Sequence, residues 1–266
     1  KELDKIGMPV GGICTGQLYL GGDGRLWHWD IFNQPIGGTG DSHYAKPMEP
    51  SSPLTQQFSL KIGDQTHTLD GNGFANITFR GEYPIGLVEY ADAKVPLTVK
   101  LEAFSPFMPL NADDSGVPAT ILQFTLRNTS AAPVEAVLTG ELENGVCLQQ
   151  RNQNAVLRNR TVRETSFTAL VCSAERPVNG QPVKGEPPVT DEALKALPGY
   201  GTMTLALLGE AADQASADAT APFAERLSGS IGRNLKLAPG ASVTVTFVLA
   251  WHFPNLSLAG PLNKAG

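Results

Sequence analysis

The densest group of residues with a potential chemical role lies near the N-terminus, where seven of the 18 positions from 7 to 24 are glycine. Gly11 and Gly16 are separated by four residues, as in the loops that hold nucleotide phosphates with backbone amides. In those loops a lysine follows the second glycine and neutralises the phosphates, whereas Gln17 stands there in this sequence. We therefore exclude nucleotide binding. Two interpretations of Gly11, Gly12 and Gly16 remain: backbone at positive φ or in close approach to another surface, and backbone that contacts a ligand directly.

The segment Arg25-Leu-Trp-His-Trp-Asp30 follows and contains two of the three tryptophans. On a regular strand Arg25, Trp27 and Trp29 would share one face of the sheet. Flat aromatic rings stack on the apolar faces of sugars, so this face could be a saccharide platform. Packing in a core or against another domain is the alternative. The candidate residues for interdomain or ligand contact are Gly11, Gly12, Gly16, Arg25, Trp27, Trp29, Asp30, Trp251 and His252.

Other arrangements that carry chemistry are missing from the sequence. The four histidines are scattered, with no pair at the spacing of metal ligands, and no G-x-S-x-G segment marks a serine nucleophile. A glycosidase needs two carboxylates roughly 5–9 Å apart. The acidic residues fall mostly in turns, such as Asp113 and Asp114, or at outward strand positions, such as Glu102. We predict no catalytic residue, no metal site and no cofactor in this chain.

The overall composition limits the classes of partner. The formal net charge is −6, from 20 basic and 26 acidic residues, and no basic stripe is present that could neutralise nucleic-acid phosphates. The longest apolar runs, such as residues 243–251, are broken by threonine and are far shorter than a membrane span. Cys14, Cys147 and Cys172 fit no metal or redox motif, and we interpret them as small buried side chains. The sequence predicts neither nucleic-acid binding nor a transmembrane segment.

Apolar and polar residues alternate at period two in most apolar stretches, which is the pattern of half-buried strands. The clearest runs are residues 95–103, 122–126 and 243–249, and weaker ones are residues 58–62, 85–90, 134–142, 154–158, 167–172 and 203–208. Turn clusters separate these runs, and only one helix is convincing, from Asp191 to Leu197 with Thr190 as its N-cap. We predict an all-β fold, a large antiparallel two-sheet β-sandwich with long loops and at most one or two short helices.

The C-terminal residues predict a domain boundary. Pro254 cannot continue a central strand, so the chain should leave the sheet after the strand that ends near Trp251. We expect residues 1–255 to form a single β-sandwich domain and residues 256–266 to begin a linker to an absent domain. The abrupt Lys-Glu-Leu-Asp-Lys start is that of a processed or trimmed chain, which favours a secreted or periplasmic location over a cytoplasmic one.

Five stretches of the sequence resemble one known family. The first two are Gly7-Met-Pro-Val-Gly-Gly-Ile-Cys-Thr-Gly16 and Gly24-Arg-Leu-Trp-His-Trp-Asp-Ile-Phe-Asn33. The others are Gly81-Glu-Tyr-Pro-Ile85, Leu101-Glu-Ala-Phe-Ser-Pro-Phe-Met-Pro-Leu-Asn111 and Phe247-Val-Leu-Ala-Trp-His-Phe-Pro-Asn255. In this order they resemble the start of glycoside hydrolase family 116, which includes the non-lysosomal glucosylceramidases, also called bile acid β-glucosidases.

The resemblance implies an N-terminal antiparallel β-sandwich followed by a helical α/α-barrel catalytic domain. In such enzymes a glutamate nucleophile and an aspartate acid/base, both in the helical domain, retain the configuration at the anomeric carbon. No catalytic residue is therefore carried over, and the chain alone is predicted to be inactive. Its expected partner is the catalytic domain of the same polypeptide and, through that domain, a glycoside or glycolipid substrate.

Three hypotheses about function follow. In the first, the chain is the non-catalytic scaffold of a retaining β-glycosidase and helps to shape the mouth of the catalytic domain. In the second, it is an autonomous carbohydrate-binding module that uses Trp27, Trp29 and Trp251. In the third, it is a structural or partner-binding sandwich outside any hydrolase.

The scaffold hypothesis predicts an exposed apolar patch where the catalytic domain docks, because monomeric proteins rarely expose apolar patches beyond a few hundred Å². We expect this patch to gather the glycine-rich backbone of residues 7–24, the side chains of Trp27, Trp29 and Phe32, and the segment after Trp251. The docking face should lie near the point where the chain leaves the sheet. If residues 7–33 lie far from residues 251–266, or if Trp27 and Trp29 are both buried inside the sandwich core, this docking face is wrong.

Overall fold

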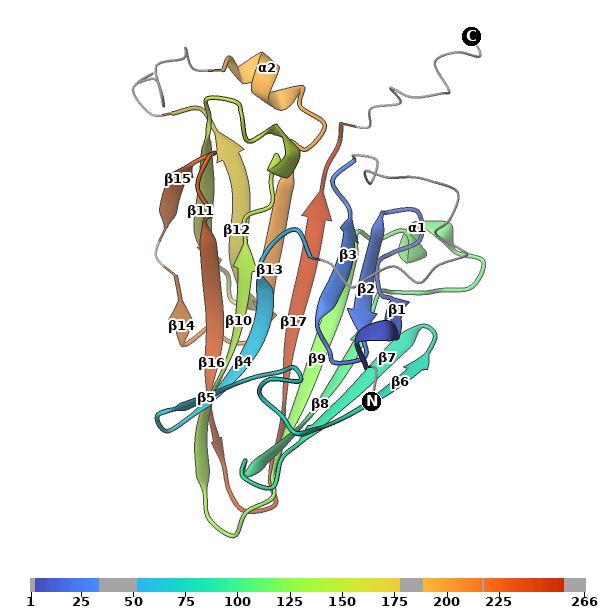
Figure 1. Ribbon diagram of the computed structural model, residues 1–266, viewed down its shortest axis with the longest axis vertical. Helices are drawn as coiled ribbons and strands as arrows, with labels where there is room; N and C mark the ends of the chain where they lie inside the picture. Colours follow the sequence, from blue (N-terminus) through green and yellow to red (C-terminus); the bar gives the residue numbers. More distant parts are fainter. Residues whose placement is uncertain (1–2, 34–51, 178–188, 217, 256–266) are drawn as a thin grey trace.

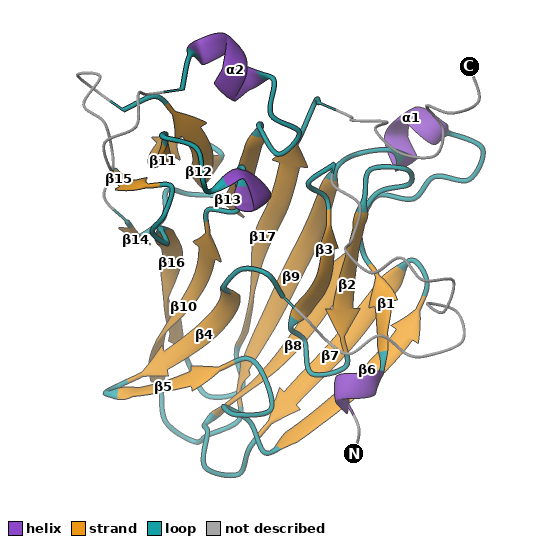
Figure 2. Cartoon of the chain, turned by 45° about the horizontal axis from the view of Figure 1, so that its top comes forward, coloured by secondary structure: helices purple, strands orange, loops and turns teal. Residues whose placement is uncertain are grey.

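The structure is a computed structural model that describes residues 3–33, 52–177, 189–216 and 218–255. The strands form three antiparallel sheets of three, five and nine strands (Figures 1 and 2). The two smaller sheets lie on the same face of the large one. The prediction of an all-β antiparallel sandwich is confirmed, with the difference that one of its two layers consists of two sheets.

The nine-stranded sheet forms one whole layer of the sandwich. Its strands, in spatial order, are β15 (Ala219–Pro222), β11 (Val156–Arg163), β12 (Phe167–Glu175), β13 (Thr202–Leu208), β17 (Ser242–His252), β9 (Ala119–Asn128), β8 (Leu97–Phe104), β7 (Ile85–Ala91) and β6 (Asn76–Glu82).

The opposite layer is divided between the two smaller sheets. The five-stranded sheet contains, in spatial order, β14 (Gln214–Ala215), β16 (Ser228–Leu237), β10 (Val134–Glu143), β4 (Gln56–Ile62) and β5 (Gln65–Thr68). The three-stranded sheet contains β1 (Gly7–Pro9), β2 (Gln17–Gly21) and β3 (Leu26–Asp30).

Strand β8 illustrates why this sequence forms a sandwich. Its side chains alternate between buried and half-buried positions along the whole strand. Val99 and Leu101 point into the core, whereas Lys100 and Glu102 form an ion pair of 3.0 Å on the outer face. A shift by one residue would move the whole apolar set to solvent, so the alternation also sets the register. All nine segments predicted as strands coincide with observed strands.

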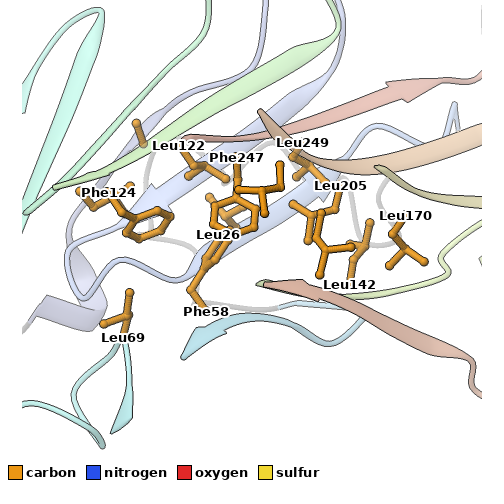
Figure 3. Packing of buried hydrophobic residues seen from close by; sticks show 14 of the residues in the cluster. Leu26, Phe58, Leu69, Leu122, Phe124, Leu142, Leu170, Leu205, Phe247 and Leu249 are labelled. Carbon is orange, nitrogen blue, oxygen red and sulfur yellow. The ribbon is translucent and has the colours of Figure 1, made fainter. Parts of the chain in front are cut away.

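Aromatic rings join the five-stranded sheet to the large sheet (Figure 3). Phe58 of β4 lies 4.7 Å from Phe124 of β9 and 5.1 Å from Phe247 of β17, measured between ring centroids. The three-stranded sheet covers another part of the same face. Leu20 of β2 lies so close to Gly86 of β7 that a Cβ at Gly86 would be 2.6 Å from the leucine Cδ2. The core therefore extends across all three sheets.

Two short α-helices occur among the described residues, α1 (Ala112–Ser115) and α2 (Asp191–Lys195), together with 3₁₀ turns at Leu3–Lys5 and Leu148–Gln150. The predicted helix is confirmed as α2, and the Thr190 side chain caps it by accepting from the Ala193 amide at 3.2 Å. Within the described part of the chain, no helix combines the length and apolarity that crossing a bilayer requires.

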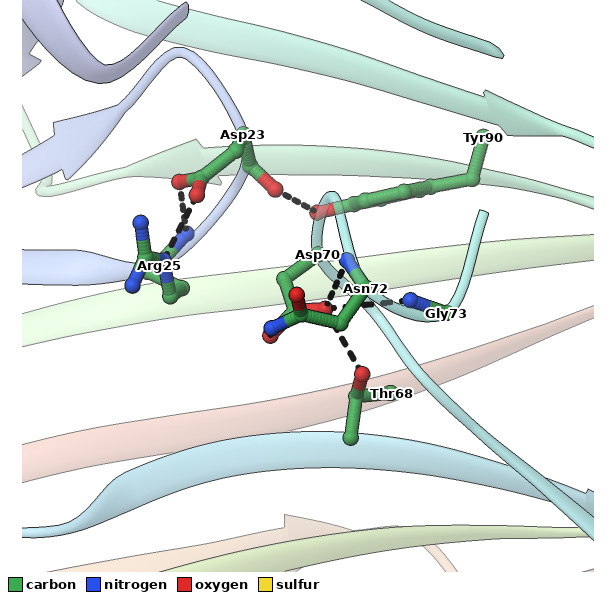
Figure 4. Close-up of polar contacts among 7 residues, drawn as sticks. All are labelled: Asp23, Arg25, Thr68, Asp70, Asn72, Gly73 and Tyr90. Carbon is green, nitrogen blue, oxygen red and sulfur yellow. Dashed lines mark hydrogen bonds and ion pairs between the residues drawn. The ribbon is translucent and has the colours of Figure 1, made fainter. Parts of the chain in front are cut away.

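The turn between β2 and β3 is tied to the large sheet through Tyr90 (Figure 4). The Tyr90 hydroxyl is buried and donates to the Asp23 carbonyl oxygen at 3.2 Å. Burial, with the nearby charges of Asp23 and Asp70, raises the pKa of Tyr90 well above its usual range, so the hydroxyl keeps its proton. The Asp23 carboxylate also accepts from Arg25 Nε at 2.6 Å. These contacts hold the N-terminal segment against β7.

Gly24 is the residue that lets this turn approach Tyr90. Replacing it, Gly24→Ala, should destabilise the fold by about 2–4 kcal/mol, since the new Cβ would lie 1.6 Å from the Tyr90 hydroxyl oxygen and φ is +91°. Gly63→Ala is the matched control, because φ there is +57° but no atom lies within 4 Å. It should lose only about 1 kcal/mol. Urea denaturation measures both changes, and equal losses would contradict the steric role of Tyr90.

Candidate functional site

The glycine-rich loop of residues 10–16 lies against the end of α1, the residues that follow it and the start of β9. Thr120 Oγ1 donates to the Val10 carbonyl at 2.8 Å, and the Ile13 amide donates to the Ser115 carbonyl at 2.9 Å. A Cβ on Gly12 would lie 2.1 Å from the Val117 carbonyl oxygen. The backbones approach each other too closely for a side chain at Gly12. The arrangement agrees with the first interpretation of these glycines, close approach to another surface.

Gly11 and Gly16 close the same loop. A Cβ on Gly11 would lie 3.0 Å from the Gly16 carbonyl oxygen and 3.7 Å from the Trp251 ring. Gly16 has φ of +106°, and a Cβ there would lie 2.6 Å from the Asp30 carbonyl oxygen. Both positions face protein atoms of the chain itself.

The end of β17 meets this loop, as predicted. The Trp251 indole donates to the Thr15 carbonyl at 2.8 Å, and the ring is 4% exposed. Beyond it, the Phe253 ring lies 5.2 Å from the Phe32 ring. His252 is exposed on the other face of the strand. The prediction that residues 7–33 and the start of the C-terminal segment lie side by side is confirmed up to residue 255, and residues 256–266 lie outside the described residues.

The two tryptophans of β3 differ from the prediction. Gln17 pairs with Asp30 and Tyr19 with Trp27, so two residues of β3 stand opposite one of β2. This is a β-bulge, and His28 occupies it with φ of +53°. Because the extra residue reverses the alternation, Trp29 enters the hydrophobic core and Trp27 does not follow it to the same face. The expectation that Arg25, Trp27 and Trp29 share one face is wrong.

Neither tryptophan ring forms an exposed platform, because each is only 5% exposed. Trp29 donates from its indole to the Leu26 carbonyl at 3.2 Å. Trp27 packs against Gly21, and the Arg25 guanidinium carbon lies 5.8 Å from its ring centroid. Phe32 is also 5% exposed. The expectation that these aromatic side chains form an exposed docking patch is therefore wrong.

The candidate Asp30 and its neighbour His28, which was not a candidate, are half-buried. Loss of hydration raises the pKa of Asp30 and lowers the pKa of His28. The His28 ring meets the Tyr19 ring edge-on, with 5.5 Å between centroids. Arg25, Trp27 and Gln56 line a hollow of about 250 Å³ beside this strand. That volume lies below the range of roughly 300–1,000 Å³ typical of ligand pockets.

An exposed apolar patch lies elsewhere at this end of the molecule, around α1 and the turn between β6 and β7. Ten large apolar side chains are exposed among the described residues. Seven of them form what we call the α1 patch: Ile13, Tyr83, Ile85, Phe107, Met108, Leu110 and Val117. None of them was among the residues predicted for contact. All except Val117 lie in the stretches that carry the family resemblance, and Phe107, Met108 and Leu110 also form an apolar run, Phe-Met-Pro-Leu.

Contacts join several members of the α1 patch. The rings of Tyr83 and Phe107 meet edge to face with 5.2 Å between centroids. The backbone of Met108 is bonded to the Ser115 hydroxyl, and the carbonyl of Ser115 accepts from Ile13. Figure 1 shows α1 and the β6–β7 turn on the same side of the molecule, and the end of β17 lies beside the loop that carries Ile13. The patch therefore adjoins the point where the chain leaves the sheet.

Leu110 is the most exposed of these side chains, with a relative exposure of 109%. It occupies the third position of a four-residue turn in which the Asn111 amide donates to the Met108 carbonyl at 3.0 Å. Its φ is +67°, which suits glycine or asparagine in this type of turn. A left-handed conformation costs a leucine about 1–2 kcal/mol. The turn thus presents a large apolar side chain to solvent at a cost in stability.

Comparisons with known proteins give one family and several distant structures. The family model described as "beta-glucosidase 2, glycosyl-hydrolase family 116 N-term" matches residues 7–262. No curated protein sequence matches the chain. A putative kojibiose phosphorylase from human microbiome is similar in structure, with a TM-score of 0.42, 8% identity, and coverage of 79% of this chain and 24% of that one.

Two further structures illustrate the range of sizes. The GH36 alpha-galactosidase AgaA from Geobacillus stearothermophilus has a TM-score of 0.37 and 10% identity, with coverage of 93% of this chain and 40% of the enzyme. A galactose mutarotase-like protein from Lactobacillus casei has a TM-score of 0.38 and 10% identity, with coverage of 93% of this chain and 100% of its own. The chain thus spans well under two thirds of the length of the phosphorylase and the galactosidase.

The three cysteines allow a test of which segments are accessible to a reagent in solution. Cys14 is exposed in the loop beside Ile13, which corrects the expectation that all three are buried. Burial raises the pKa of both Cys147 and Cys172 to about 12, so roughly one thiol in ten thousand is ionised at pH 8. We expect iodoacetamide to modify only Cys14 in the folded chain and all three in denaturant. Mass spectrometry counts the adducts, and rapid modification of Cys147 or Cys172 in the folded chain would contradict their burial.

Proposed function

The chain belongs to the family of N-terminal domains of glycosyl-hydrolase family 116, and on that premise we propose that it is the non-catalytic β-sandwich of a retaining β-glycosidase of the β-glucosidase or glucosylceramidase type. It packs on the catalytic domain of the same polypeptide and helps to shape the entrance to that domain's active site. Residues up to 255 form the sandwich domain, and residues 256–266 begin the linker. The glycoside or glycolipid substrate binds to the catalytic domain.

The observation that supports this proposal is the α1 patch. Isolated exposed apolar residues need no explanation, but seven that gather around α1 and the β6–β7 turn mark a contact surface. An interdomain contact typically covers about 600–1,500 Å². Trp251 lies beside the patch, because its indole donates to Thr15 and its amide donates to the Pro118 carbonyl, next to Val117. A domain attached after the last strand therefore reaches the patch over a short distance. This position favours a partner in the same polypeptide over a separate protein.

Glu143, a buried glutamate of β10, has polar contacts that fit a structural role. Glu143 is 3% exposed. Its carboxylate accepts from Arg226 Nε at 2.9 Å and from the Thr55 amide at 2.8 Å. A carboxylate held in this way joins β10 to neighbouring segments, whereas a general acid needs access to substrate. Burial of Trp27 and Trp29 removes the main support for the carbohydrate-binding module.

The proposal predicts that the chain alone does not hydrolyse an aryl β-glucoside. We expect no release of nitrophenol above the uncatalysed rate from 4-nitrophenyl β-glucoside, while the full-length enzyme releases it. A thermal melt of the same sample shows that the chain is folded. Turnover by the chain that is lost in a single carboxylate variant such as Glu143→Gln would overturn the proposal.

The proposal also predicts that the catalytic domain covers the loop of Cys14. We expect iodoacetamide to modify Cys14 at least tenfold more slowly in the full-length enzyme than in the chain alone, because the docked domain excludes the reagent. The peptide that carries Cys14 is quantified by mass spectrometry, with fully denatured enzyme as the reference for complete labelling. Equal rates in both proteins would show that this face is not the docking surface.

A further inference from the structure

Leu110 stands out because its position is unfavourable for the isolated domain. Its side chain is fully exposed, so it gains nothing from burial in the described fold, and its φ of +67° would suit glycine or asparagine better. A residue kept in a strained conformation at a surface indicates a function outside its own fold. The strain is what presents the isobutyl group at the tip of the turn.

Hydrogen bonds to Ser115 and Asn111 hold the turn that carries Leu110. The hydroxyl of Ser115, which is 1% exposed, accepts from the Met108 amide at 2.8 Å and donates to the Met108 carbonyl at 3.0 Å. On the other side, the Asn111 side chain caps α1 by accepting from the Asp114 amide at 3.1 Å. The backbone of Leu110 is thus fixed between two anchored residues, and little backbone entropy remains to be lost when the residue binds.

We propose that Leu110 is the anchor residue of the α1 patch and that it inserts into an apolar pocket of the catalytic domain. This inference rests on the proposed function. Binding energy at interfaces is concentrated in a few side chains that enter pockets, surrounded by contacts that exclude water. The other residues of the patch suit the surrounding role. Phe107 is 38% exposed and is already engaged by Tyr83, whereas Leu110 has no side-chain surface covered by the domain.

The test uses Leu110→Asn, which removes the apolar side chain and suits the left-handed backbone. In the chain alone this variant should melt at the same temperature as the wild type or higher. In the full-length enzyme, Cys14 should lose its protection, with alkylation at least tenfold faster than in the wild type. Leu208→Asn is the matched control, because Leu208 is an exposed leucine, 41%, outside the patch. It should leave the protection of Cys14 unchanged.

The outcomes separate the anchor from the docking face. If Leu110→Asn lowers the melting temperature of the chain alone, Leu110 serves its own fold and the inference is wrong. If Cys14 stays protected in the full-length variant, the domains dock without Leu110 and the inference is also wrong, while the proposed function stands. If Cys14 is unprotected in the wild-type full-length enzyme, the docking face fails, and the anchor fails with it.

Discussion

A sheet of nine strands with one apolar face needs more cover than a five-stranded sheet supplies. The alternation that makes β8, β9 and β17 good strands also gives them a continuous apolar surface, and exposing that surface to water would cost roughly 25 cal/mol per Å². The N-terminal three-stranded sheet covers what the five-stranded sheet leaves open, with Leu20 and Met8 placed against Gly86 of β7. The position of the glycine-rich segment follows from this requirement.

Covering the sheet in this way brings chain segments that are distant in sequence to one end of the molecule. The N-terminal segment is held at one end by the Tyr90–Asp23 hydrogen bond and at the other by contacts of residues 10–16 with Thr120 and Trp251. The second set of contacts places the loop of Ile13 directly beside α1 and Val117. The α1 patch is thus a consequence of how the small sheet is attached, because its residues come from separate loops.

The sequence was sufficient to predict strands whose burial alternates strictly, since a half-buried strand specifies its own register. Strand β16 was missed because Gly229 and Gly232 interrupt its apolar pattern, and the structure shows that both lie where neighbouring side chains or backbone come close. The bulge at His28 was also missed, since alternation in the sequence cannot reveal an extra residue opposite a neighbouring strand. The position of the C-terminal segment beside the N-terminal loop was predicted, but the aromatic residues expected to form the exposed surface are buried and the α1 patch was not recognised.

Backbone strain is distributed unevenly in this fold. Among the described residues, five that are not glycine have positive φ, and four of them lie in the N-terminal segment or in the loop before α1: Cys14, His28, Asn33 and Leu110. Strained conformations persist only where surrounding contacts over-determine them, and here the nine-stranded sheet provides such contacts to the loop of Cys14 through Thr120 and Trp251. A rigid sheet that supports strained loops at one end presents a preformed surface, which lowers the entropy lost on association. The attachment of the small sheet, which completes the core, therefore also holds this end of the domain in a preformed shape for association.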